Sequence, residues 1–133
     1  ALVQRLVFGD MYNQSLHRVT LPSGLLGLEF GERFDKSLQE VTLPTSLQSL
    51  TFAGEWNQFN QSLEEVILPA NLQTLIFGHG FNQDLELVTL PSNLKKLTFG
   101  FNFAWSLERV TLPDSLQSLT FGTLFDHSLE RVV

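Results

Sequence analysis

Cysteine is absent from the 133 residues, which excludes disulfide bonds and metal sites built on thiolates. Charged residues are scarce at 17%, and acidic residues outnumber basic ones by 14 to 8, for a net charge of −6. Binding to nucleic acid or to an anionic membrane surface requires a basic patch, so we expect neither partner. No apolar run approaches the roughly 20 residues of a membrane span, and residues 1–10 are too short and polar for a signal peptide.

Phenylalanine is abundant, and it recurs at a fixed interval. One series is Phe8, Phe30, Phe52, Phe77, Phe99 and Phe121, and a second is Tyr12, Phe34, Phe59, Phe81, Phe103 and Phe125. A leucine series runs Leu16, Leu38, Leu63, Leu85, Leu107 and Leu129. All three share a 22-residue period that is lengthened once to 25. We therefore expect one repeat domain over residues 1–133, with units joined at Pro22, Pro44, Pro69, Pro91 and Pro113.

The repeat unit reads L-P-x-x-L-Q-x-L-T-F-G-x-x-F-N-Q-S-L-E-x-V-T and divides into two similar halves that average 11 residues. Glycine or proline recurs every 11 residues on average, at intervals that alternate between 9 and 13 outside the lengthened unit, which leaves no room for a helix of ordinary length. The alternation in [LV]-T-[LF], with its β-branched residues, is typical of a strand. The pattern predicts an all-β parallel solenoid of about six coils, in which each half-unit is interpreted as a short strand followed by a turn. The alternative, which the sequence leaves open, is that one of the two half-units is irregular.

These motifs resemble a leucine-rich repeat, whose core is L-x-x-L-x-L. The segments LPTSLQSLTF (43–52) and FGHGFNQ (77–83) are similar to the FNIP-type repeat, and LERVTLPDSLQSL (107–119) resembles the short leucine-rich repeats of surface antigens. The resemblance covers essentially the whole chain. It implies a right-handed solenoid and a binding role, without naming a ligand. Two departures are the missing leucine-rich-repeat asparagine and the Ser-Leu that replaces the FNIP-type Pro-Ile after Asn-Gln.

Four polar columns accompany the repeat. Asn or Asp follows the second aromatic residue in most coils, and two carboxylates are too few for a calcium ladder, so we expect these side chains to hydrogen-bond their own turns. A glutamate column is read as a solvated edge, with an acidic ridge for a basic partner as the alternative. Threonine columns favour ice or mineral binding as a minor alternative function. The columns are Asn13, Asp35, Asn60, Asn82 and Asp126; Glu64, Glu86, Glu108 and Glu130; Thr20, Thr42, Thr89 and Thr111; and Thr51, Thr98 and Thr120.

The segment AGEWNQ (53–58) contains the three-residue insertion that breaks the period. Insertions into a repeat form loops on one face, often the binding face. Trp56 has no counterpart in other coils, Trp105 replaces a Gln or Lys, and Phe101 is the only Phe outside the two series. We predict that Glu55, Trp56, Phe101 and Trp105 contact a protein partner. The alternative is that the two tryptophans only cover gaps in the coil.

Catalysis has little support in this sequence. The three histidines, His17, His79 and His127, fall in different coils. No phosphate-binding glycine loop or metal-ligand spacing is present in the sequence. We therefore expect no enzyme activity, no cofactor and no metal.

Neither end of the chain carries a polar cap, so we expect the first and last coils to expose core positions and open strand edges. The candidate edge residues are Leu2, Leu6, Phe8, Leu129 and Val132. Such edges predict either a segment of a longer array or a homo-oligomer formed through the ends. The main hypothesis is a non-enzymatic scaffold that binds an unidentified protein through a rigid solenoid face, and a self-associating array segment is the alternative.

Overall fold

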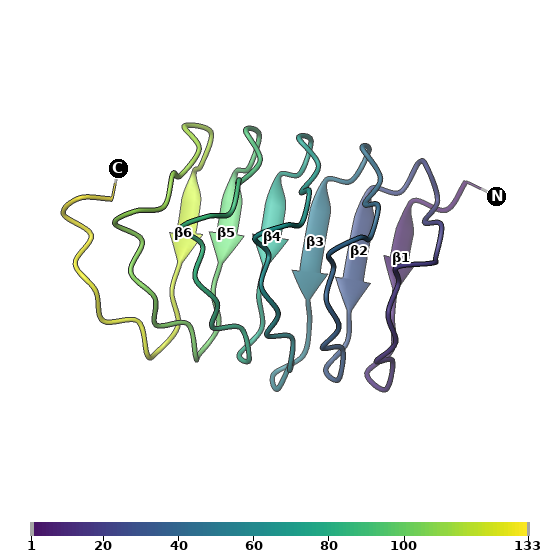
Figure 1. The fold of residues 1–133 in the computed structure, drawn as a ribbon, viewed down its shortest axis with the longest axis horizontal. Coiled ribbons are helices and arrows are strands. Elements are labelled where there is room, and N and C mark those ends of the chain that lie inside the picture. Colours follow the sequence, from purple (N-terminus) through teal and green to yellow (C-terminus); the bar gives the residue numbers. More distant parts are fainter. Residues whose placement is uncertain (1, 133) are drawn as a thin grey trace.

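The computed structural model describes residues 2–132, which wind through successive coils that each contribute one short strand (Figure 1). The strands are β1 (Arg5–Val7), β2 (Gly27–Phe30), β3 (Ser49–Phe52), β4 (Thr74–Ile76), β5 (Lys96–Thr98) and β6 (Ser118–Thr120). They form a six-stranded parallel sheet whose spatial order follows the chain order. The predicted parallel β solenoid is therefore confirmed. Across these residues no helix has the length and apolar character needed to cross a membrane.

The strand register places equivalent positions of the repeat side by side. Leu28 lies opposite Leu50, its equivalent in the next repeat along the chain. Leu50 in turn lies opposite Leu75, so the offset from β3 to β4 is one repeat plus the insertion. The insertion therefore lies in the connection between these two strands and leaves the sheet intact. In this register like side chains stack on like.

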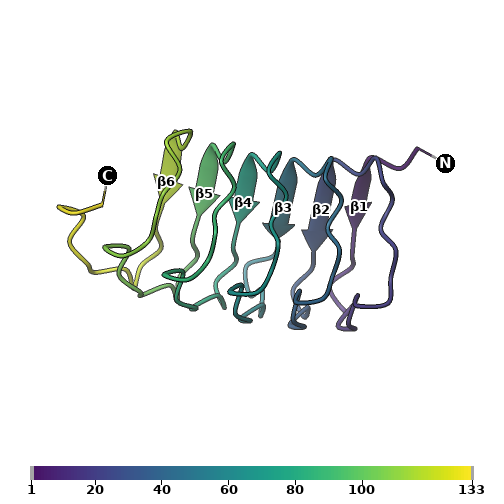
Figure 2. The same cartoon turned by 45° about the horizontal axis from the view of Figure 1, so that its top comes forward.

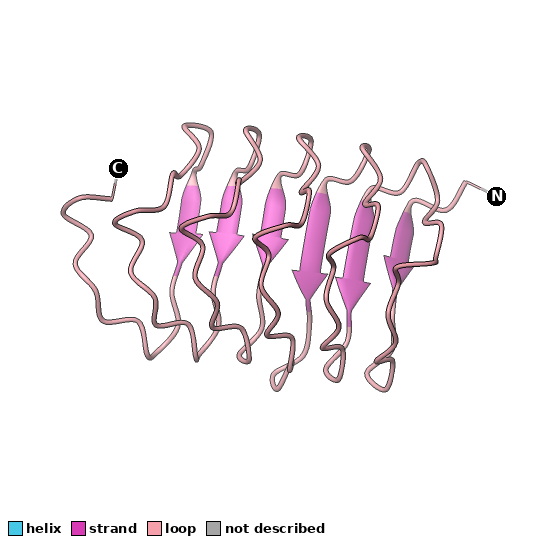
Figure 3. Ribbon diagram, viewed as in Figure 1, coloured by secondary structure: helices cyan, strands magenta, loops and turns pink. Residues whose placement is uncertain are grey.

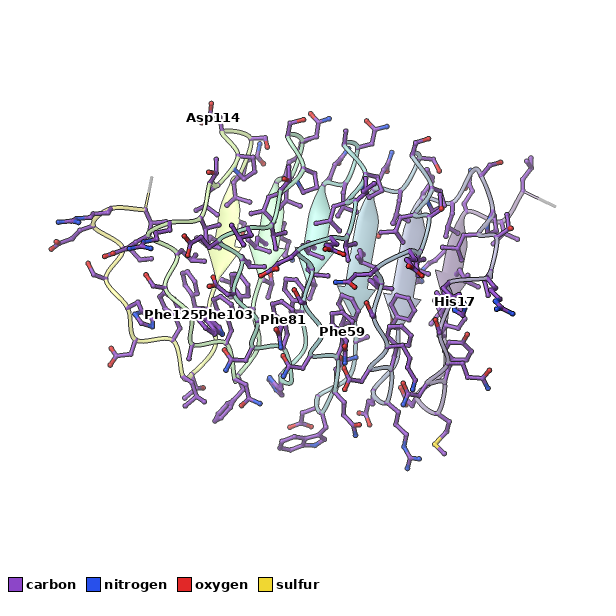
Figure 4. All side chains as sticks on the ribbon, viewed as in Figure 1. His17, Phe59, Phe81, Phe103, Asp114 and Phe125 are labelled. Atoms are coloured by element: carbon purple, nitrogen blue, oxygen red, sulfur yellow. The ribbon has the colours of Figure 1, made fainter. Side chains whose placement is uncertain are left out.

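Two columns of aromatic rings run through the core beside the sheet. Figure 4 shows part of the second column, with Phe59, Phe81, Phe103 and Phe125 in a row across successive coils. Within a coil the two rings stack with centroids 3.8–4.4 Å apart, and each ring also stacks on its equivalent in the next coil. Stacked leucines such as the fully buried Leu75 fill the rest of the interior. The core thus consists of the residues that define the period.

The second half of each unit forms no strand within residues 2–132, so the prediction of two strands per coil is wrong (Figure 3). In this part of the chain no backbone hydrogen bond joins the V-T-L segments of neighbouring coils. Their side chains nevertheless alternate, because Val41 and Leu43 are buried and Thr42 between them is exposed. Alternating apolar and polar residues indicate that one face of the segment is buried. Burial of one face does not require a ladder of hydrogen bonds to the neighbouring coils.

The spacing between stacked rings increases from the first aromatic column to the second. In the ring column next to the strands, exemplified by Phe30 and Phe52, successive centroids are 5.3–5.8 Å apart. In the next column, exemplified by Phe34 and Phe59, they are 6.0–6.3 Å apart. Backbone hydrogen bonds still join the coils at the corner beside the second column, as from Gly80 N–H to Asn57 O at 2.9 Å, and they are absent between the V-T-L segments of the described residues. Figure 2 shows the resulting pattern of one strand and connecting loops in every coil.

Tight turns bend the chain at the corners of each coil. Turns in and after the second coil are closed by the bonds from Phe34 N–H to Gly31 O at 3.3 Å, Val41 N–H to Leu38 O at 3.2 Å and Leu47 N–H to Pro44 O at 3.1 Å. The last of these turns begins with proline throughout the repeat. Pro44 is buried, and a proline has no N–H that would need a partner at a buried corner.

The Asn and Asp column joins neighbouring coils, which corrects the expectation that these side chains bond their own turns. The backbone N–H of Asp35 donates to Asn13 Oδ1, that of Asn60 to Asp35 Oδ1 and that of Asn82 to Asn60 Oδ1, each at 2.9 Å. The N–H of Ala104 continues the series by donating to Asn82 Oδ1 at 3.1 Å. Each side-chain oxygen therefore satisfies a backbone donor one coil away, where the sheet provides none.

The two threonine columns lie on different sides of the coil. Thr51 is part of β3, whereas Thr42 stands on a V-T-L segment. A regular sheet therefore supports only one of the two columns. Ice or mineral binding stays a prediction, and thermal hysteresis measurements would test it.

Replacing Phe81 by alanine is expected to lower the free energy of unfolding by about 3–5 kcal/mol, because the ring is fully buried in the middle of the second aromatic column and also stacks on Phe77 of the first. Denaturant-induced unfolding followed by circular dichroism measures the change. Ile67→Ala is the matched control, since Ile67 is 85% exposed and its loss should change stability by no more than about 0.5 kcal/mol. Equal effects of the two substitutions would contradict the stacked core.

Candidate functional site

The inter-coil hydrogen bonds identify the three inserted residues. Gln58 N–H donates to Glu32 O at 2.7 Å, and Gly80 N–H donates to Asn57 O at 2.9 Å. The regular coils make the same bond between equivalent positions, so Asn57 and Gln58 belong to the repeat. The extra residues are therefore 54–56, Gly-Glu-Trp, within the predicted segment 53–58.

A buried asparagine anchors this loop. The Asn57 side chain is 1% exposed, and its Nδ2 donates to Gly31 O and to Ala53 O, both at 2.9 Å. Its Oδ1 accepts a hydrogen bond from Phe59 N–H at 3.1 Å. Gly54 reverses the chain with φ of 99°, a conformation that suits glycine because it lacks a Cβ. The loop is thus held from both ends by satisfied polar groups.

The side chain of Trp56 projects from the anchored loop and is 70% exposed, so it does not cover a gap. It meets His79 of the next coil edge to face, with ring centroids 6.1 Å apart and planes at 66°. His79 meets Phe101 in the same way one coil further on, at 6.1 Å and 77°. The three rings form a row across three consecutive coils at the corner that follows the strands.

This row borders a surface groove of about 750 Å³. The groove also takes in Glu55 on the inserted loop, Asp35 from the preceding coil and Gly80. A Cβ on Gly80 would lie 2.6 Å from Asn57 O, so a side chain there would collide with the loop backbone. Phe101 N–H donates to His79 Nδ1 at 3.0 Å, which fixes the imidazole ring and places its proton on Nε2 when the ring is neutral.

Trp105, the remaining predicted contact residue, lies outside this groove. Its Nε1 donates to Asn82 O at 3.1 Å, as Gln83 Nε2 donates to Asn60 O at 3.2 Å one coil earlier. Trp105 therefore keeps the inter-coil hydrogen bond of the glutamine that it replaces. The side chain also borders a shallow depression of about 230 Å³.

That depression includes two members of the glutamate column, Glu86 and Glu108. Arg109 Nη1 lies 3.8 Å from Glu86 Oε1, and both side chains are well exposed. Exposed ion pairs of this kind contribute little to stability. The predicted contact residues thus divide into Glu55, Trp56 and Phe101 in the groove and Trp105 beside the acidic column.

Sequence reasoning missed Asn57, His79 and Asp35 as parts of the groove. A signal for His79 was present, since it stands one repeat before Phe101 and therefore beside it in the preceding coil. Asn57 carried no such signal, because its burial results from how the inserted loop closes. Asp35 was noted only as a member of the Asn and Asp column.

The predicted self-association edges lie on the two end coils. Leu6, Phe8 and Val132 are partly buried and pack against the core, whereas Leu2 is almost fully exposed. Leu129 is 46% exposed, although the other leucines of its column are buried. Self-association through these residues stays a prediction, which light scattering over a wide concentration range would test.

Comparison with family models identifies FNIP repeats at residues 12–55, 59–102 and 81–124, which together cover most of the chain. The chain belongs to the FNIP repeat family. Among solved structures it is similar to CroV588, described as a novel circular LRR protein, with 30% sequence identity, a TM-score of 0.62 and 93% of this chain covered. The FNIP chain spans 24% of that protein's length. A comparison with curated proteins found no significant match.

The structure also accounts for the serine that stands where the FNIP pattern has proline. Ser37 Oγ accepts a hydrogen bond from Gln39 N–H at 3.1 Å, two residues further on. Ser62 and Ser106 do the same for Glu64 and Glu108, each at 3.2 Å. A serine hydroxyl thus caps the turn that a proline would otherwise stiffen.

Replacing Asn57 by alanine is expected to cost about 1–3 kcal/mol of unfolding free energy, because it leaves buried backbone groups without partners. Thermal or denaturant unfolding measures the loss. Asn102→Ala is the matched control, since Asn102 borders the same groove with an exposed side chain. Hydrogen exchange should rise at residues 53–59 in the Asn57 variant, and an unchanged rate would contradict the anchoring role.

Proposed function

We propose that this FNIP repeat protein is a non-enzymatic scaffold that binds a protein partner at the groove between the inserted loop and the two following coils. One observation carries the proposal. Trp56 is a large aromatic side chain that is mostly exposed, yet it stands on a loop whose backbone is anchored by buried hydrogen bonds. Exposed aromatic residues on a rigid frame are typical of the residues that dominate binding energy at protein interfaces.

The rest of this corner supports an interface longer than the groove itself. Met11 occupies the corner of the first coil and Leu124 that of the sixth, and both side chains are substantially exposed. Leu124 N–H donates to Phe101 O at 3.1 Å, which places these two residues in adjoining coils. Exposed apolar side chains thus extend the aromatic row from Phe101 to the sixth coil, whereas Glu32 and Arg33 separate Met11 from it, and exposed apolar surface of this kind is typical of an interaction site.

The rigid frame lowers the entropic cost of binding. Each corner is joined to the next coil by a backbone hydrogen bond, including the bond from Asn102 N–H to His79 O at 3.1 Å. Little backbone ordering is then required when a partner docks. FNIP and leucine-rich repeats are commonly scaffolds for protein interaction, and stacked repeats offer extended binding surfaces of this kind.

Replacing Trp56 by alanine is expected to weaken binding to the protein partner by roughly 30-fold or more, the effect typical of a central interface residue. Partners captured from an extract of the source cells by the wild-type protein are identified by quantitative mass spectrometry. The affinity of each purified partner is then measured by calorimetry. The fold should persist, because the substituted side chain is mostly exposed.

Trp105→Gln is the matched control for this experiment. It removes an exposed tryptophan outside the groove and restores the glutamine that other coils use for the same hydrogen bond. Binding that survives Trp105→Gln and is lost with Trp56→Ala supports the groove. The reverse result would move the interface to the acidic column beside Trp105, and insensitivity to both would refute the proposed site.

A further inference from the structure

We infer that the groove recognises a cationic side chain, arginine or lysine, presented by an extended segment of the partner protein. This inference rests on the proposed function and adds the chemistry of the occupant. It is carried by two carboxylates and three aromatic rings that border one groove in which no lysine or arginine takes part.

The charges around the groove have one sign. Glu55 and Asp35 border it, and Glu55 has no ion-pair partner among residues 2–132. Asp35 uses Oδ1 to accept hydrogen bonds from Asn60 N–H and Gln61 Nε2, which orients its carboxylate. A cation entering the groove would gain the attraction of both carboxylates, and an anion would meet their repulsion.

Basic residues of the neighbouring coil do not neutralise this charge. Lys36 follows Asp35 in sequence, but its side chain borders a separate depression with Ser37 and Glu40. Arg33 is exposed, makes no ion pair within the described part of the chain and does not border the groove. The carboxylates of the groove are therefore available to a partner.

The aromatic walls favour the same occupant. Cations bind over the faces of Trp, Tyr and Phe rings, and a planar guanidinium also stacks on them. Trp56, His79 and Phe101 meet edge to face in succession, and Gly80 adds no side chain between them. The volume of about 750 Å³ exceeds that of one side chain, so a short stretch of peptide fits with its cationic residue.

The test is a selection of random 12-residue peptides on the whole wild-type protein, with counter-selection on the Trp56→Ala variant. The expected result is enrichment of arginine or lysine among peptides that depend on Trp56. Enrichment of uncharged or acidic peptides that still depend on Trp56 would contradict recognition of a cationic side chain, and the proposed function would still stand. If no selected peptide depends on Trp56, both the recognition of a cationic side chain and the groove as a binding site are refuted.

A matched pair of probes then isolates the charge. One enriched peptide is synthesised with its arginine and again with citrulline, the neutral isostere, and both are titrated by calorimetry. The citrulline probe should bind at least tenfold more weakly. Glu55→Gln should lower the affinity for the arginine probe about fivefold and reduce the difference in affinity between the two probes. Glu65 is an exposed glutamate that does not border the groove, so Glu65→Gln should leave both affinities unchanged. Equal affinity of the two probes would overturn the inference.

Discussion

Register between coils is the constraint on which the rest of this molecule depends. The parallel ladder from β1 to β6 pairs each position with its equivalent one repeat away, so the buried leucines of the strands, such as Leu28 and Leu50, lie against one another. Stacking of this kind favours residues that pack well against identical side chains, such as phenylalanine and leucine. It also rewards side chains that can accept a hydrogen bond from the backbone of the next coil, which Asn and Asp do at one corner.

An insertion is costly in such a frame, because its backbone groups have no equivalent residues in the neighbouring coils to pair with. Residues 54–56 avoid this cost by looping away from the coil, and Asn57 supplies the missing partners from its own side chain. Gly78 makes room for it, since a Cβ there would collide with the Asn57 side chain. The arrangement presents Trp56 to solvent without loosening the coils on either side.

Sequence periodicity predicted the columns, the direction of the strands and the position of the insertion, because each of these is a property of one repeat and its copies. It failed for the V-T-L segments, whose alternation equals that of a true strand. The difference is that no backbone hydrogen bond joins these segments across neighbouring coils of the described residues, although their side chains are buried in the same alternating order. Backbone pairing depends on how neighbouring coils are placed, and the alternation within one repeat reports only which side chains are buried.

The same limit applies to the candidate site. Trp56 and Phe101 were recognisable as exceptions to the repeat, and an offset of one full repeat puts His79 beside Phe101. Predicting that these residues border one groove would have required knowing the path of the inserted loop. The loop brings Trp56 against His79 of the following coil. A binding site built across three coils is therefore a product of one local irregularity in a regular frame. The stacked core keeps the backbone of the corners in place. Exposed corner residues, such as Trp56 and Phe101, therefore differ from coil to coil without disturbing that core.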